Sequence, residues 1–223
     1  MTRAVVFDAY GTLIDTGTGS VDATREILKK RGREDISPSV FYADWKKYHR
    51  AHIDALSEFV CEEEIFRRDL RKLYSCYGID GDADSDVSIM LDTMGNRCSF
   101  PEAAEVINAL SGSFVLCIGS TSDTLPLLRD VERNRLGIEE HFVFTSELLR
   151  TYKPRREFYT AIAERIHVDY GEILFVGDSL IDDVFGPSQV GMKTCHIDRK
   201  AKGSAGFLPD YTVKNLFGLL EIL

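Results

Sequence analysis

Residues 5–15 read VVFDAYGTLID, and this stretch decides the fold. Its first three residues form an apolar run of the kind that builds a buried strand, and the run stops at Asp8. Gly11 and Thr12 then break the pattern within one turn. Open α/β sheets place their chemistry at the carboxyl ends of the strands, so we expect Asp8 to belong to a functional site.

The rest of the chain shows two sequence patterns, one purely helical and one in which strands and helices alternate. The strand at residues 4–8 is followed by a polar stretch, about residues 19–94, whose apolar residues recur at helical spacing. In this stretch we expect helices at 20–30, 37–56, 61–77 and 84–94. From Pro101 strands and helices alternate. We expect strands at 114–118, 142–145, 173–176 and 193–197, helices at 101–110, 123–133, 154–165 and 183–190, and a strand edge with a final helix at 213–223.

This alternation predicts an α/β fold with a doubly wound parallel sheet, interrupted by an all-helical insert just after its first strand. We therefore expect a Rossmann-like core at residues 1–17 and 95–223, and a helical domain at 18–94. An insert at this position can close over the strand ends like a lid.

Composition and charge narrow the class of protein. A net charge of −9 without a compensating Lys/Arg stripe argues against a nucleic-acid surface. No apolar run approaches the ~20 residues that cross a bilayer, and the N-terminus has the pattern of a strand, so we expect no membrane partner and no signal peptide. Five scattered cysteines without CxxC spacing indicate reduced thiols and a cytoplasmic protein. The sequence does not predict an oligomeric state.

Four signals fall at expected strand ends or in adjoining loops. They are Asp8, then Ser120 and Thr121 after the strand VLCIG, then Lys153 in TYKP, then Asp178, Asp182 and Asp183 in FVGDSLIDDV. Two acidic clusters, hydroxyls and one lysine at one edge of a parallel sheet suggest that an anion and a divalent cation bind together.

Mg²⁺ is the cofactor that this pattern favours. Asp8 and Asp178 would repel each other at close range unless one were protonated or a cation lay between them. Mg²⁺ prefers carboxylate oxygens together with substrate oxygens and waters. One carboxylate can then act as a nucleophile, while Ser120, Thr121 and backbone N–H groups hold a small anionic substrate and Lys153 neutralises charge.

These residues resemble the haloacid dehalogenase superfamily, whose four motifs match FDAYGTL, IGS, the lysine of TYKP and GDSLIDD in order. The helical insert lies where that family carries its first type of cap. The resemblance implies that Asp8 is the nucleophile, that Ser120 binds the anion and that Lys153 balances charge. It also implies that Asp178 and Asp183 form the acidic pair of the last motif, of which Asp178 touches the metal directly. Asp182 is expected to face outward or to support them.

Tyr10 is where the chain departs from the phosphatases of this family, which usually carry there a second aspartate that acts as acid and then as base. A phenol with a pKa near 10 is a poor base at neutral pH. We expect Tyr10 either to line the pocket or to take part in catalysis, and its backbone carbonyl to remain available to the metal. The string FDAYGTL is typical of the metal-independent 2-haloacid dehalogenases. Trp45-Lys46 lies where these enzymes have Trp-Arg, which makes Lys46 a candidate substrate anchor.

Asp178 favours the other branch, because dehalogenases have a small neutral residue at that position. The sequence therefore predicts a hydrolase with an aspartate nucleophile, with Mg²⁺-dependent hydrolysis of a small phosphorylated metabolite as the favoured reaction. A 2-haloacid dehalogenase is the alternative. A catalytically weakened relative that binds a ligand or a partner is the third possibility. The substrate itself is not predicted.

Overall fold

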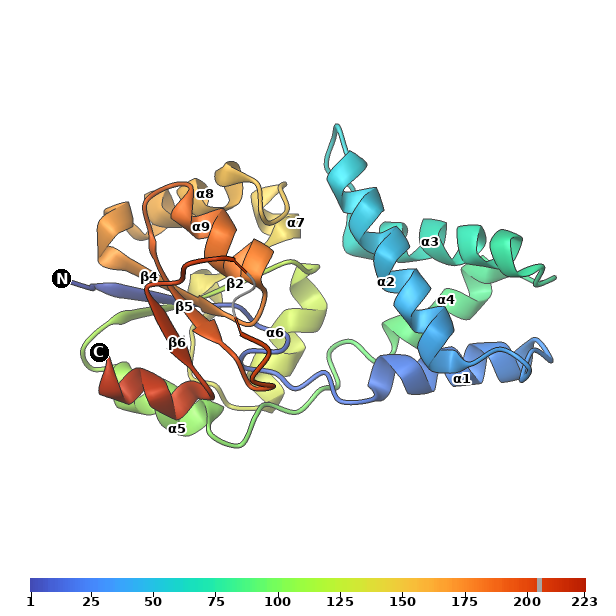
Figure 1. Ribbon diagram of the computed structural model, residues 1–223, viewed down its shortest axis with the longest axis horizontal. Coiled ribbons are helices and arrows are strands. Elements are labelled where there is room, and N and C mark those ends of the chain that lie inside the picture. The colour runs from blue at the N-terminus through green and yellow to red at the C-terminus, as the bar shows by residue number, and fades with distance from the viewer. Residues whose placement is uncertain (204–205) are drawn as a thin grey trace. The chain divides into compact units, whose positions relative to one another are not determined.

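The computed structural model describes residues 1–203 and 206–223, and the chain forms two compact units (Figure 1). One unit comprises Met1–Asp15 and Cys98–Leu223, and the other comprises Thr16–Arg97. Within the described residues no helix is both long and apolar enough to cross a membrane. The assignment of the helical insert as a cap, and its limits at residues 18 and 94, stay predictions.

The larger unit is built on a six-stranded sheet in which all neighbouring strands are parallel. The strands follow the order β3-β2-β1-β4-β5-β6. Their bounds are β1 (Ala4–Phe7), β2 (Val115–Ser120), β3 (Val143–Thr145), β4 (Ile173–Gly177), β5 (Lys193–Ile197) and β6 (Tyr211–Val213). The order reverses direction at β1, between β2 and β4. The predicted doubly wound parallel α/β sheet is thus confirmed.

Helices cover both faces of this sheet (Figure 1). Their bounds are α5 (Ala103–Leu110), α6 (Thr124–Arg133), α7 (Ser146–Leu149), α8 (Arg156–Ile166) and α9 (Gly186–Ser188). Short 3₁₀ turns lie at η1 (Glu140–Phe142), η2 (Tyr170–Glu172) and η4 (Leu216–Glu221), and η3 (Leu180–Phe185) is a π-helical turn.

The first strand is buried on both faces, and this explains its unbroken apolar sequence. Successive side chains of a strand point to opposite sides. Accordingly Val5 and Phe7 pack with residues of α5, α6 and η4, while Ala4 and Val6 pack with residues of α8. β1 is therefore fixed at the centre of the core, and the position of the residue that follows it is fixed too.

The smaller unit contains α1 (Gly19–Lys30), α2 (Pro38–Ala55), α3 (Glu62–Tyr77) and α4 (Ala83–Leu91). These helices enclose a separate apolar core in which Trp45 is 1% exposed. The core face also contains a buried carboxylate, Asp69, which bonds the Nδ1 atoms of His49 and His52 at 2.9 and 2.7 Å. The four helices predicted from the spacing of apolar residues are all present in this unit.

The structure departs from the predicted elements at several places. In place of the single helix expected at 183–190, the structure has the π-helical turn η3, which begins at Leu180, followed by the short helix α9. The hydroxyl of Ser179 accepts a hydrogen bond from the N–H of Asp182 and caps the first turn. The short helix α7 was not predicted. The final segment forms a 3₁₀ turn, η4, where a longer helix was expected.

Candidate active site

The candidate site lies where the three central strands end. β1 ends at Phe7, directly before Asp8, and it pairs with β2 on one side and with β4 on the other. β2 ends at Ser120 and β4 ends directly before Asp178. Parallel strands end at the same edge of a sheet, so residues far apart in the chain meet at one point.

A cavity of about 160 Å³ opens at this edge, and it is lined entirely by residues of the larger unit. Its lining includes seven residues that the sequence predicted: Asp8, Tyr10, Ser120, Thr121, Lys153, Asp178 and Asp183. Asp182, expected to face outward or to support the others, lines it too, and so does Ser179, which was not predicted. The structure thus brings the four sequence signals together in one place.

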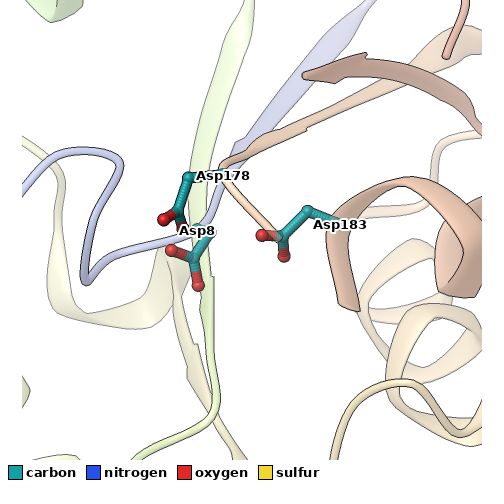
Figure 2. Close-up of side chains that lie close together, drawn as sticks. All are labelled: Asp8, Asp178 and Asp183. Carbon is teal, nitrogen blue, oxygen red and sulfur yellow. The ribbon is translucent and has the colours of Figure 1, made fainter. Parts of the chain in front are cut away.

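Three carboxylates converge at the cavity (Figure 2). Asp8, Asp178 and Asp183 each offer one oxygen, and these oxygens all lie within 4.8 Å of one another. Asp8 is 9% exposed and Asp183 is 1% exposed, whereas Asp178 is open to solvent. Carboxylates gather at this distance only at an energetic cost unless positive charge lies among them.

Lys153 supplies part of that positive charge. Its Nζ donates to Asp8 Oδ1 and to Asp183 Oδ1, both at 2.8 Å, and the residue is 1% exposed. Burial opposes protonation, but the charges of Asp183 and Asp8 outweigh it and raise the pKa of Lys153 above its usual value. The ammonium is therefore charged at neutral pH and ties the first and last motifs together.

The acids that face Asp8 are less easily ionised than free carboxyls. Partial removal from water, followed by the negative charge of Asp8, raises the pKa of Asp178 to about 6. Complete burial raises the pKa of Asp183, an effect that the Lys153 ammonium opposes. The backbone N–H of Ser179 also donates to Asp183 Oδ2 at 3.0 Å. The three carboxylates therefore outnumber the single ammonium, and the site has an excess of negative charge.

Two glycines make room for these acids. Gly11 has a φ of +98°, and a Cβ there would lie 2.6 Å from Asp178 Oδ2. A Cβ on Gly177 would lie 2.2 Å from Asp183 Cγ. Both distances are shorter than any van der Waals contact, so a side chain at either position would displace a carboxylate. The close approach of backbone and acid therefore depends on glycine.

Tyr10 lines the cavity, and its hydroxyl donates to Asp130 Oδ2 at 3.0 Å. Asp130 lies on α6 and is completely buried. Sequence reasoning did not find Asp130. The sequence did contain a signal for this residue. Leu127 and Val131 define the core-facing side of α6, and Asp130 lies on that side, where an acid is unusual.

Lys46, the candidate substrate anchor, lies on α2 of the smaller unit and is exposed. Its Nζ lies 5.2 Å from the centroid of the Tyr42 ring. Its role in substrate binding stays a prediction.

The donor set fits a hard divalent cation. Asp8, Asp178 and Asp183 offer oxygens at close range, and the backbone carbonyl of Tyr10 belongs to a residue of the same cavity. Mg²⁺ is typically held by one or two carboxylates plus other oxygen ligands. The glycine contacts at Gly11 and Gly177 keep side-chain carbon away from these oxygens. Asp8, Tyr10, Asp178 and Asp183 are thus the residues that could hold Mg²⁺.

Comparison with known proteins relates the chain to one group of hydrolases. A family model described as haloacid dehalogenase-like hydrolase matches residues 2–191. The (S)-2-haloacid dehalogenase 4A of Burkholderia cepacia is 26% identical over 213 residues, which cover 89% of this chain and 84% of that protein. The pyrimidine 5'-nucleotidase YjjG of Escherichia coli (strain K12) is 26% identical over 138 residues, so the match spans only 60% of each protein.

The fold is also found among solved structures. YfnB from Bacillus subtilis, in a structure bound to magnesium, superposes with a TM-score of 0.82 and 21% identity, covering 100% of this chain and 98% of that one. At this identity the likeness concerns the fold. The relatives named above include both a dehalogenase and a nucleotidase, so likeness alone does not choose between the two reactions.

Proposed function

The chain belongs to the haloacid dehalogenase-like hydrolases, and from this premise we propose that it hydrolyses a small phosphorylated metabolite in a Mg²⁺-dependent reaction with Asp8 as the nucleophile. The relatives include a nucleotidase and a dehalogenase, so the argument for phosphate rests on the charges of the site.

The charge balance around Asp8 carries this proposal. Asp8, Asp178 and Asp183 face a single ammonium, that of Lys153. When the three acids are ionised, two negative charges are left over among these four groups, which is the charge of one divalent cation. A phosphate group would add further negative charge, so its binding requires a cation here. Burial, followed by the negative charge of Asp8, raises the pKa of Asp178 to about 6.

The side chains support the following course of reaction. Lys153 engages Asp8 through Oδ1, which leaves Oδ2 to attack the phosphorus atom. Ser120 and Thr121 line the cavity where they can hold the phosphoryl oxygens. Thr121 Oγ1 is buried without a hydrogen-bond partner among the described residues, as expected of a group that receives a ligand.

The bond from phosphorus to the leaving oxygen breaks as the bond to Asp8 forms, which gives an acyl phosphate, and the leaving oxygen takes a proton from solvent water. A water molecule then attacks the phosphorus and loses a proton to the solvent, and the P–O bond to Asp8 breaks, which releases inorganic phosphate and restores the Asp8 carboxylate. Mg²⁺, when held by Asp8, Tyr10, Asp178 and Asp183, supplies the positive charge that neutralises the acids and the transferring group.

A 2-haloacid dehalogenase is the second candidate, and Tyr10 together with the likeness to the Burkholderia enzyme favours it. In this reaction Asp8 would attack carbon and release halide, and no cation would be required. Asp178 argues against it, because an acid beside Asp8 would repel both the nucleophile and the carboxylate of a halo acid.

Assays of the purified protein against phosphorylated metabolites and against 2-halo acids, each with Mg²⁺ and with EDTA, test the proposal. We expect phosphate release that requires Mg²⁺ and disappears in Asp8→Asn. Halide release that EDTA does not affect would establish the dehalogenase instead. Ligand binding that survives Asp8→Asn, without either product, would indicate a weakened relative of the enzymes.

A further inference from the structure

Asp130 is a buried acid that the course of reaction above does not use. It lies on α6, in which Leu127 and Val131 face the apolar core, and it is completely buried between them. A carboxylate removed from water costs free energy unless hydrogen bonds compensate for it. An acid kept at this position therefore suggests a specific task.

One partner of this carboxylate is a residue of the site. Asp130 Oδ2 accepts the hydroxyl of Tyr10 at 3.0 Å, across 120 positions of the chain. The Tyr10 ring packs against the same core cluster as α6, and the residue lines the cavity that contains Asp8 and Asp178. One end of Tyr10 is thus fixed in the core and the rest of it forms part of the cavity wall.

We propose that Asp130 is a positioning residue, which holds Tyr10 in the single orientation that the reaction at Asp8 requires. The inference rests on the proposed function and extends it to α6. Tyr10 follows Asp8 by two residues, in a loop closed by hydrogen bonds from the N–H groups of Leu13 and Ile14 to the carbonyl of Ala9. A rotation of the Tyr10 side chain would therefore disturb the loop that carries the nucleophile.

This arrangement also shows where the phenolic proton of Tyr10 is directed. The hydroxyl is directed to Asp130 on α6, so the ring acts as a wall beside the reacting group. Displacements of about 1 Å at a reacting centre can cost about a hundredfold in rate. Fixing the wall and the nucleophile loop together is thus of direct use to catalysis.

A double-mutant cycle tests the role of Asp130. The variants are Tyr10→Phe, Asp130→Leu and Asp130→Asn, together with each Asp130 substitution combined with Tyr10→Phe. Glu132→Gln is a matched control that removes an exposed acid of the same helix. Activity is measured with p-nitrophenyl phosphate and Mg²⁺, and with 2-chloropropionate, at a temperature well below the melting point of every variant. Thermal unfolding is recorded in parallel.

We expect each of Tyr10→Phe and Asp130→Leu to lower kcat about tenfold, and the combination to lower it no further, because both remove one interaction. KM should stay within about twofold of the wild-type value. Asp130→Asn should recover most of kcat, because the amide oxygen still accepts the phenolic hydrogen. Glu132→Gln should behave as the wild-type protein.

Losses that multiply in the combination, or a lower melting temperature with unchanged kcat, would overturn the positioning role. Should Asp130→Leu fail to fold, Asp130→Asn tests the positioning role instead. The role requires that Asp130→Asn is more active than Tyr10→Phe, and that adding Asp130→Asn to Tyr10→Phe does not change the activity further. A wild-type protein that turns over neither substrate would contradict the proposed function itself, and the positioning role with it.

Discussion

Lys153 Nζ donates to Asp8 Oδ1 at 2.8 Å, although 145 positions separate the two residues. The same ammonium reaches Asp183, and both contacts are buried. Removing a lysine from water is costly, and the charged form is stable here because two carboxylates accept hydrogen bonds from it. The contact joins the loop before α8 to the end of β1. The Lys153 side chain thus both balances the charge of the acids and holds two parts of the fold together.

Replacement of this lysine should therefore affect both stability and activity. In Lys153→Met the buried acids lose their counter-charge, and we expect a loss of about 3 kcal/mol in the free energy of unfolding. Phosphate release should fall at least a hundredfold, because Asp8 is no longer held. Urea unfolding and a phosphate assay measure the two effects. Lys214→Met, at an exposed position, is the control; equal effects in the two variants would contradict the assignment.

Removal of the acid at position 178 should stabilise the metal-free protein. The folded state raises the pKa of Asp178 to about 6, so above this pH the ionised carboxylate lowers the stability of the folded state relative to the unfolded chain. In EDTA at pH 8 we expect Asp178→Asn to melt about 1–3 °C above the wild-type protein, a modest gain because Asp178 is open to solvent. The gain should shrink as the pH falls below 6 and vanish near 4.

Mg²⁺ should act in the opposite direction on the same pair of proteins. It should raise the melting temperature of the wild-type protein and have little effect on Asp178→Asn, which should also lose phosphatase activity. Asp169→Asn, an exposed substitution in the same unit, is the control. An Asp178→Asn protein that keeps both the response to Mg²⁺ and the activity would show that the cation binds elsewhere.

The sequence was sufficient to predict the sheet and most of the residues that line the cavity. Parallel strands bring the ends of apolar runs together, so Asp8 and Asp178 could be placed at one edge of the sheet from the sequence alone. Asp130 escaped prediction, because its role depends on which α6 residue meets Tyr10, and that depends on tertiary packing. For the same reason the sequence could identify the exposed Lys46 as a candidate substrate anchor but could not predict which groups it contacts.

The glycine at the end of β4 should resist substitution. In Gly177→Ala the new Cβ would lie 2.2 Å from Asp183 Cγ, so the carboxylate that accepts from Lys153 must move. We expect a loss of about 1–3 kcal/mol in stability and about a hundredfold in activity. Gly171→Ala is the control, because no atom of the described residues, its chain neighbours apart, lies within 4 Å of a Cβ there. Full activity in Gly177→Ala would argue against a fixed position for Asp183.

The stability of the helical unit should depend on pH through His49. Burial alone would lower its pKa, but Asp69 and Glu62 outweigh burial and raise it to about 9. A raised pKa means that the folded state binds the proton more tightly, so the stabilisation is complete below pH 6.5 and is lost as the pH rises through 9. Its size is about 2–3 kcal/mol.

Urea unfolding followed by the fluorescence of Trp45, the single tryptophan of the chain, measures this effect in the unit that contains it. The difference in stability between the wild-type protein and His49→Gln should be largest near pH 6 and disappear near pH 10. His141→Gln, at an exposed position, should show no such trend. A difference independent of pH would mean that His49 is neutral in the folded protein.

The covalent state of Asp8 during turnover tests the central claim most directly. The protein is mixed with a phosphorylated substrate that it hydrolyses, quenched in acid within one turnover and digested for mass spectrometry. The account predicts a phosphoryl group on the peptide that contains Asp8, formed with Mg²⁺ and absent both in EDTA and in Asp8→Asn. A phosphoryl group on another residue, or an ester at Asp8 formed from a halo acid in EDTA, would contradict it.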